Sequence, residues 1–288
     1  MAATGLEFTV MGVVNVTPDS FSDGGLYSDA GAAIAHALEL EAEGAGILDI
    51  GGESTRPGAD PVDAGEELRR VVPVIEGLTQ RGVRAQISID TSKASVAAAA
   101  MDAGATLVND VTALRGDPAL AELVAARDAD CCLMHMLGEP RTMQVDPRYD
   151  DVVSDVKAFL EERMAFAMAQ GVAEERILLD PGIGFGKTAE HNLELLARVG
   201  ELVALGRPVV IGTSRKSFLG RITGRAVDDR LPATIATNVL AFERGARVFR
   251  VHDVAPVYDG LVIAGATVRR RWPTTTTTPR STTRTLTT

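Results

Sequence analysis

The chain alternates between short apolar runs and longer amphipathic stretches, and it does so eight times. The short runs have strand length, while the segments between them have the apolar spacing of helices that bury one face. Strands joined by helical crossovers in this way run parallel in one sheet. Eight such units in about 270 residues predict an α/β protein with a single (β/α)8 TIM barrel. The expected strands are 8–15, 46–51, 84–90, 105–110, 130–136, 176–180, 208–213 and 246–252.

An open, doubly wound sheet is the main alternative to the barrel. Such a sheet would carry a Gly-x-Gly-x-x-Gly fingerprint after its first strand. The sequence there is "NVTPDSF", which does not match. Many of the helical stretches end on a glycine before the next strand, as helix C-termini commonly do. The barrel is therefore the favoured fold.

Polar side chains stand at the carboxyl end of every expected strand, whereas the amino ends carry little comparable chemistry. Barrel enzymes build their active sites at the carboxyl ends of the strands. This pattern predicts a functional site at that face. In chain order the residues are Asn15, Asp49, Asp90, Asn109, His135, Asp180, the group Ser214, Arg215 and Lys216, and His252.

The alternation of side chains along a strand shows which of these groups share a face. Arg250 and His252 are two residues apart and project together, and Ser88 and Asp90 do the same on the third strand. We expect these polar sets to face the barrel interior and the apolar sets to face the helices. Burying an unpaired charge costs a free energy on the order of several kcal/mol. The charged groups should therefore pair with one another or with a ligand.

Composition excludes some classes of function. The 288 residues are 45% hydrophobic, with a formal net charge of −10, which argues against a non-specific nucleic-acid binder. The start of the chain does not have the pattern of a secretory signal, and no apolar run approaches the roughly 20 residues of a membrane span. We expect a cytoplasmic protein with no membrane partner. The adjacent Cys131 and Cys132 do not have zinc-site spacing, which predicts buried thiols.

The last segment of the sequence differs from the rest. Residues 272–288 read "WPTTTTTPRSTTRTLTT", a threonine-rich stretch with almost no core-forming residues. Such composition is typical of disorder. We therefore expect residues 1–271 to form the catalytic barrel and residues 272–288 to form a disordered tail.

Eight motifs together resemble, in order and spacing, those of the bacterial dihydropteroate synthases, which are pterin-binding barrel enzymes. They are "GVVNVTPDSFSDGG", "DIGGESTRPGA", "SIDT", "VND", "LMHM", "LDPGIGFGKT", "GTSRKSFLG" and "RVHDV". The resemblance covers residues 8 to 270. It implies an enzyme of folate synthesis that joins 6-hydroxymethyl-7,8-dihydropterin diphosphate to 4-aminobenzoate and releases diphosphate. It also implies Mg²⁺ and a homodimer.

The resemblance assigns a role to each matching residue. For the pterin it implies Asp90, Asn109, Asp180, Lys216, Arg250, Phe185 and Met134. A carboxylate suits the pterin because it accepts two adjacent N–H donors. For the diphosphate it implies Thr55, Arg56, Arg250 and His252, and for Mg²⁺ it implies Asn15 and Asp23. For 4-aminobenzoate it implies Ser214, Lys216, Phe185, Pro57 and Phe21. The catalytic set is Lys216, Arg250, His252 and Asp90, and the first loop, 15–25, is expected to be a mobile lid.

The implied chemistry is a dissociative substitution at the pterin methylene carbon, which needs no covalent nucleophile. Three other functions stay open at this point. They are a methyltransferase acting on methyltetrahydrofolate, an aldolase forming a Schiff base on Lys216 with Arg215 lowering its pKa, and a pterin-binding protein without catalysis. His135 is interpreted as a core histidine rather than a site residue.

Overall fold

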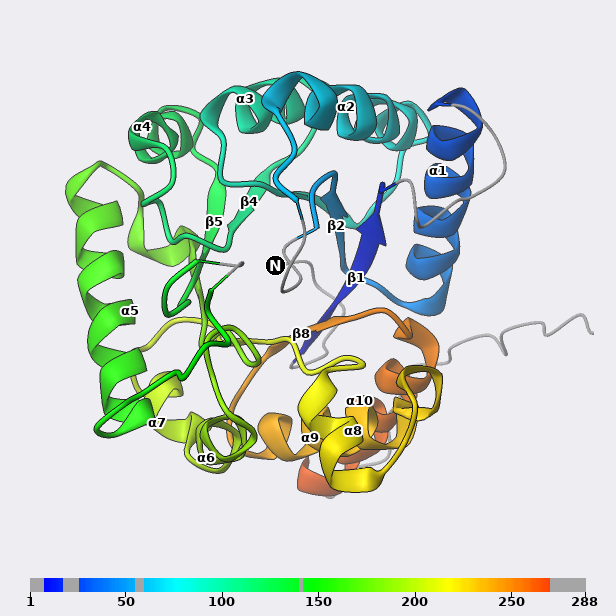
Figure 1. Cartoon of the computed structure of the whole chain (residues 1–288). Coiled ribbons are helices and arrows are strands. Elements are labelled where there is room, and N and C mark those ends of the chain that lie inside the picture. The colour runs from blue at the N-terminus through cyan, green and yellow to red at the C-terminus, as the bar shows by residue number, and fades with distance from the viewer. Residues whose placement is uncertain (1–7, 18–25, 55–59, 140–141, 270–288) are drawn as a thin grey trace, which may run out of the picture.

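The computed structural model describes residues 8–17, 26–54, 60–139 and 142–269. Within them, parallel strands form one sheet in the order β6-β5-β4-β3-β2-β1-β8-β7. A bridge between Leu179 and Val209 joins β6 to β7, so the sheet closes on itself. Figure 1 looks along the barrel, with the helices arranged as an outer ring. The expected TIM barrel is confirmed.

The strands are β1 (Thr9–Asn15), β2 (Ile47–Gly51), β3 (Gln86–Asp90), β4 (Leu107–Asp110), β5 (Asp130–Met134), β6 (Ile177–Asp180), β7 (Val210–Ile211) and β8 (Val248–Val251). The helices are α1 (Leu26–Glu43), α2 (Ala64–Gln80), α3 (Ala94–Ala103), α4 (Pro118–Ala126), α5 (Val152–Ala169), α6 (Ala189–Ala197), α7 (Val199–Val203), α8 (Ser217–Thr223), α9 (Leu231–Glu243) and α10 (Val254–Arg269). Short 3₁₀ turns, η2 (Glu174–Arg176) and η3 (Val227–Asp229), precede β6 and α9.

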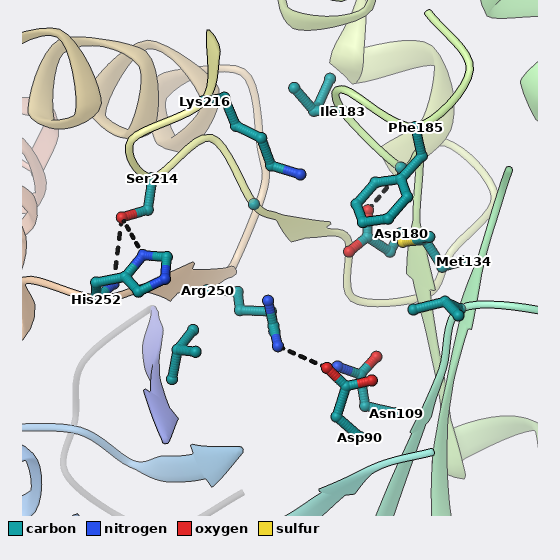
Figure 2. Close-up of a pocket in the computed structure, with 14 residues that line it drawn as sticks. Asp90, Asn109, Met134, Asp180, Ile183, Phe185, Ser214, Lys216, Arg250 and His252 are labelled. Carbon is teal, nitrogen blue, oxygen red and sulfur yellow. Dashed lines mark hydrogen bonds and ion pairs between the residues drawn. The ribbon is translucent and has the colours of Figure 1, made fainter. Parts of the chain in front are cut away.

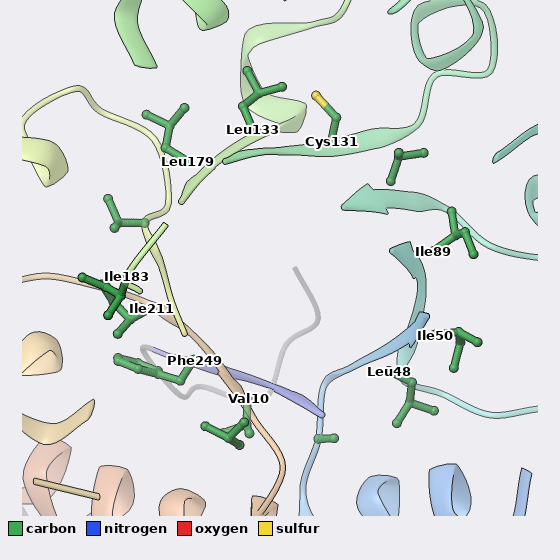
Figure 3. Packing of buried hydrophobic residues seen from close by; sticks show 14 of the residues in the cluster. Val10, Leu48, Ile50, Ile89, Cys131, Leu133, Leu179, Ile183, Ile211 and Phe249 are labelled. Atoms are coloured by element: carbon green, nitrogen blue, oxygen red, sulfur yellow. The ribbon is translucent and has the colours of Figure 1, made fainter. Parts of the chain in front are cut away.

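Two apolar layers hold the barrel together. The larger layer lies between the strands and the helices, where Ile50, Ile89 and Phe249 are fully buried; Figure 3 shows these side chains on the outer side of the strands. The smaller layer fills the barrel interior with Met11, Ile47, Leu107, Cys132, Val210 and Val248. Burying one large aliphatic side chain contributes roughly 1.5–3 kcal/mol. The apolar sets face the helices as expected, but polar side chains face the interior mainly toward the carboxyl ends of the strands, and the rest of the interior is apolar.

Four details differ from the sequence-based expectation. The strands are shorter than the apolar runs, most clearly in β7, because strand pairing ends where the chain turns into the loops. The alternation of strands and helices predicts one helix between consecutive strands, but the stretch 189–206 divides into α6 and α7 at Arg198, and α8 precedes α9. The amino ends of the strands are also more polar than expected. There, Asp130 accepts hydrogen bonds from Gln86 (2.7 Å) and Arg176 (3.1 Å).

Other expectations about the core are confirmed. Cys131 and Cys132 are buried, unbridged thiols on opposite faces of β5, and burial raises the pKa of Cys131 to about 12. Glycines in the left-handed region follow several helices, such as Gly104 after α3 and Gly245 after α9.

Among the residues that the structure describes, no helix combines the length and apolarity that a membrane span requires.

Candidate active site

A cavity opens at the carboxyl ends of the strands, and side chains from most of the barrel converge on it (Figure 2). Strand register brings these residues together, since Asp90 lies beside Asn109 and Met134 lies beside Asp180. The sequence-predicted residues Asp90, Asn109, Asp180, Ser214, Lys216, Arg250 and His252 all line this cavity, as do Met134 and Phe185. Val13, Val111, Gly182, Ile183 and Gly212 complete the lining.

The centre of the site is a cation held between two carboxylates. Arg250 Nε donates to Asp49 Oδ2 (2.7 Å), and its Nη2 donates to Asp90 Oδ2 (2.8 Å). Burial alone would lower the pKa of Arg250, but Asp49 and Asp90 outweigh that effect and raise it. The guanidinium therefore stays charged, with its orientation fixed by two strands. This pairing is the outcome expected for charges inside the barrel.

Asp90 has an unusual acidity for a carboxyl group. Burial raises its pKa to about 7, with Arg250 opposing the rise and Asp49 adding to it. A carboxyl group that titrates near neutral pH can hold or release a proton under working conditions. Asp90 can therefore serve as hydrogen-bond acceptor or donor to a bound ligand.

Asp180 at the end of β6 (Ile177–Asp180) presents one oxygen to the cavity. Its Oδ1 accepts the backbone N–H of Gly182 at 2.7 Å, which leaves Oδ2 for a ligand. Burial raises the pKa of Asp180, while the hydrogen bond from Gly182 opposes the rise. Gly182 has a φ of +65°, and a Cβ there would lie 1.8 Å from the carbonyl oxygen of His135. Only glycine fits between these two strand ends.

A backbone kink after β7 aims the neighbouring side chains in different directions. Arg215 has a φ of +58°, in the left-handed region that non-glycine residues seldom adopt. Its guanidinium pairs with Asp253, with Nη2 donating to Oδ1 at 2.6 Å, whereas Ser214 and Lys216 line the cavity. Because Arg215 is paired with Asp253, the structure does not support a role for it in activating Lys216 as a Schiff-base amine.

Ser214 also holds the ring of His252 in place. The serine Oγ accepts the backbone N–H of His252 at 3.2 Å and lies 3.0 Å from its Nδ1. The hydroxyl and Nδ1 share one hydrogen bond, whose direction depends on the tautomer of the ring. This contact holds the His252 ring at the cavity, where a protonated imidazole can donate to an anion.

The loop after β6 carries Phe185, whose ring faces Lys216 with Nζ 4.1 Å from the ring centroid. Two side chains stabilise this loop by donating hydrogen bonds to its backbone carbonyl groups. Lys187 Nζ donates to the carbonyl of Phe185 (3.0 Å), and Tyr149 Oη donates to the carbonyl of Gly186 (2.8 Å). His135 is buried beside Lys187, does not line the cavity, and fits the interpretation as a core histidine.

Sequence reasoning missed the role of Asp49 and Ser88. It placed Asp49 at a strand end without a function, and it placed Ser88 only on the inner face. Both side chains are fully buried, and Ser88 Oγ donates to Asp49 Oδ1 at 2.7 Å. The alternation along β2 puts Asp49 on the face of Ile47, which lies inside the barrel. That alternation was the signal that could have identified it.

Five predicted site residues lie outside the described residues, namely Phe21, Asp23, Thr55, Arg56 and Pro57. The same holds for most of the expected lid. Asn15 ends β1 and lies beside Gly51 of β2, so it is at the correct face of the barrel. Within the described ranges, no group of three or more His, Cys, Asp or Glu side chains could hold a metal ion.

Comparisons with known proteins agree with this geometry. The model of the family "Pterin binding enzyme" matches residues 11–252. A dihydropteroate synthase from Escherichia coli K12 is 44% identical over 259 residues, which cover 90% of this chain and 91% of the relative. The chain belongs to the dihydropteroate synthase family. As a member of that family it is a transferase of folate synthesis.

Solved structures support the same assignment. A dihydropteroate synthase from Xanthomonas albilineans with 4-aminobenzoic acid is 49% identical, with a TM-score of 0.85 over 90% of this chain and 93% of that chain. The enzyme from the same organism in complex with 7,8-dihydropteroate is 46% identical, with a TM-score of 0.82 over 90% of this chain and 93% of that chain. These relatives favour the synthase over the methyltransferase alternative.

Proposed function

We propose that the cavity holds the dihydropterin ring by its hydrogen-bonding edge. Asp180, Asn109 and Asp90 supply oxygen acceptors from three strands on one side of the cavity. An aminopyrimidinone ring has adjacent N–H donors that match such acceptors. Met134 and Phe185 supply apolar surface on the same side (Figure 2).

Donors at the centre of the cavity and on the side away from Asn109 suit the departing diphosphate (Figure 2). Lys216 and Arg250 are cationic, and the imidazole of His252 can donate a further N–H. Fixed donors aimed at an oxygen that gains negative charge lower the barrier to its departure. We assign Arg250 and His252 to the diphosphate, with Thr55 and Arg56 as further donors. Lys216 contacts the pterin and the incoming amine.

In the proposed reaction the bond between the pterin methylene carbon and the diphosphate oxygen breaks, and the oxygen keeps the electron pair. The electron-rich dihydropterin stabilises the carbocation that develops. The amine of 4-aminobenzoate then forms the new C–N bond and loses one proton. The 4-aminobenzoate lies at the mouth, beside Ser214, Lys216 and Phe185, with Pro57 and Phe21 completing its pocket.

Mg²⁺ is proposed as the cofactor, with Asn15 and Asp23 as its protein ligands. Magnesium prefers oxygen donors and is commonly held by one or two protein groups together with substrate phosphates. The amide oxygen of Asn15 at the end of β1 fits that chemistry. When bound, the ion neutralises charge on the diphosphate. A homodimer is likewise proposed from the family resemblance, and sedimentation of the purified chain tests it.

The observation that carries this function is the division of one cavity between an acceptor side and the donors at its centre and on the side away from Asn109. The test is release of diphosphate by the purified full chain. Release should require the dihydropterin diphosphate, 4-aminobenzoate and Mg²⁺ together, with formation of 7,8-dihydropteroate in equal amount. A chain that binds pterin without turnover would instead be a binding protein. Lys157→Met, on the outer surface of α5, is the control that should keep full activity.

A further inference from the structure

Asp49 lies directly beneath the cavity and does not line it. Its carboxylate is fully buried and accepts hydrogen bonds from three other strands. Ser88 Oγ donates to Oδ1 at 2.7 Å, while Asn109 Nδ2 (3.0 Å) and Arg250 Nε (2.7 Å) donate to Oδ2. Asp49 therefore contacts two proposed substrate-binding residues without being able to touch the substrate.

These contacts decide which end of the Asn109 amide faces the substrate. An asparagine amide has a donor end and an acceptor end. The Nδ2 end of Asn109 is held by Asp49 Oδ2, an oxygen that also accepts from Arg250. A flipped amide would place its oxygen against that acceptor and lose the hydrogen bond between the two side chains, which costs free energy inside a protein. The Oδ1 end of Asn109 is thus the end available to the cavity.

Asp180 has the same arrangement on β6 (Ile177–Asp180). Its Oδ1 is held by the backbone N–H of Gly182, and its Oδ2 is left for a ligand. The ligand therefore meets two acceptor atoms whose identity is set by hydrogen bonds below the cavity. A heterocycle with N–H donors at this edge satisfies both, whereas a carbonyl oxygen in the place of an amino group would face an acceptor.

We infer that Asp49 is a positioning residue that sets the donor and acceptor pattern of the site, and thereby selects a 2-amino heterocycle over its 2-oxo analogue. This inference rests on the proposed pterin site. Ser88 contributes to this positioning, since its hydroxyl donates to the second carboxylate oxygen of Asp49. Asp49 and Ser88 affect the substrate only through Asn109 and Arg250.

The test compares two ligands that differ at one group. Pterin carries the 2-amino group, and lumazine carries a carbonyl oxygen there. Both are titrated into the full chain at pH 7, with ligand fluorescence as the readout. The wild type should prefer pterin by roughly thirtyfold or more, because one ligand oxygen would otherwise face a buried acceptor. In Asp49→Ala the preference should fall at least about threefold, because the Asn109 amide can turn so that its oxygen accepts from Arg250 Nε, while Asp180 Oδ2 still faces the ligand and keeps the remaining preference.

Asp49→Asn is the matched conservative variant. Its introduced oxygen can take the place of Oδ2, while its NH₂ donates to the hydroxyl of Ser88, which can also accept. This variant should keep most of the preference for pterin, even if both affinities fall. Adding Ser88→Ala to Asp49→Asn removes the hydroxyl that accepts from the introduced NH₂ group. The introduced amide can then rotate, so the preference should fall as it does in Asp49→Ala. The double variant serves as the test if Asp49→Ala does not fold.

The outcomes separate the inference from the proposed function. An unchanged pterin preference in Asp49→Ala, or in the double variant, would overturn the inference and leave Asp49 with a structural role. Equal loss of preference in Asp49→Asn would also overturn it, because the acceptor is retained there. Pterin binding by the wild type with no preference over lumazine contradicts the inference alone. Absence of pterin binding by the wild type contradicts the proposed function as well.

Discussion

Lys187 Nζ lies 2.9 Å from Nδ1 of His135, and both side chains are buried behind the loop that carries Phe185. Burial, together with the charge of Lys187, lowers the pKa of His135 to about 3. Burial also lowers the pKa of Lys187 to about 7, although Asp180 opposes the shift. Lys187, which supports the active-site loop, therefore has a pKa close to neutral pH.

This pair should make folding stability depend on pH. The unfolded chain keeps Lys187 protonated up to its ordinary pKa of 10.5, whereas the folded chain releases the proton near pH 7. The unfolded state binds more protons between these values, so the free energy of unfolding rises with pH across that window. From pH 7 to pH 9, the wild type should gain roughly 2 kcal/mol more than Lys187→Met, by urea denaturation. Lys157→Met, which removes an exposed lysine, should follow the wild type. A Lys187→Met curve parallel to the wild type would mean that the buried amine does not titrate in this window.

Asp180→Asn should cripple pterin binding. The introduced amide will keep its oxygen on the N–H of Gly182, so its NH₂ group will face the N–H donors of the ligand. Loss of a charge-assisted hydrogen bond together with this clash should cost roughly 3 kcal/mol or more. Calorimetry with pterin measures the change. Asp130→Asn at the opposite end of the barrel is the control and should leave pterin affinity unchanged. An affinity of Asp180→Asn within about threefold of wild type would remove Asp180 from the site.

Gly182→Ala should destabilise the fold at the active site. A Cβ there would lie 1.8 Å from the carbonyl oxygen of His135, and the φ of +65° disfavours a side chain in any case. We expect a loss of about 3 kcal/mol or more in the free energy of unfolding. Gly31→Ala is the opposite case, because nothing lies within 4 Å of its added Cβ in an exposed position of α1. That change should stabilise the chain by about 0.5–1 kcal/mol. A well-folded Gly182→Ala with normal stability would show that the two strand ends can separate.

The order of substrate binding should depend on which residues form the proposed 4-aminobenzoate pocket. Phe185 is braced by Lys187, whereas the other proposed walls, Phe21 and Pro57, lie outside the described residues and are expected from the sequence alone to be loop positions. We expect 4-aminobenzoate to bind the free chain weakly. Its affinity should rise at least tenfold, about 1.4 kcal/mol, in the presence of pterin, diphosphate and Mg²⁺. Arg56→Ala should abolish most of this gain while pterin binding persists. Equal affinity with and without the first ligands would contradict the expected lid function of the first loop.

Deletion of residues 273–288 should leave the activity and melting temperature nearly unchanged, because this threonine-rich segment lacks a core-forming pattern. Calorimetric melting of the full and shortened chains, measured together with diphosphate release, is the check. A drop in melting temperature of more than a few degrees would show that the segment packs on the barrel.

The sequence by itself determined the barrel and most of the site. Eight alternations of strand and helix specify a parallel sheet, and a polar residue at each strand end places the site at one face. The two-residue repeat of a strand was enough to put Arg250 and His252 on the same face, because that periodicity is local. The resemblance in the motifs supplied the roles that these side chains could have.

Only the tertiary structure decided which of these groups meet. Arg250 and Asp49 are 201 residues apart, and they pair because β8 closes on β1, which lies beside β2. Whether Lys187 is an exposed cation or a buried amine likewise depends on packing against His135, which follows β5 and is 52 residues away in the sequence. Hydrogen-bond partners and buried charges are set by strand register and barrel closure. Those are contacts between distant parts of the chain, which a local pattern of residues does not encode.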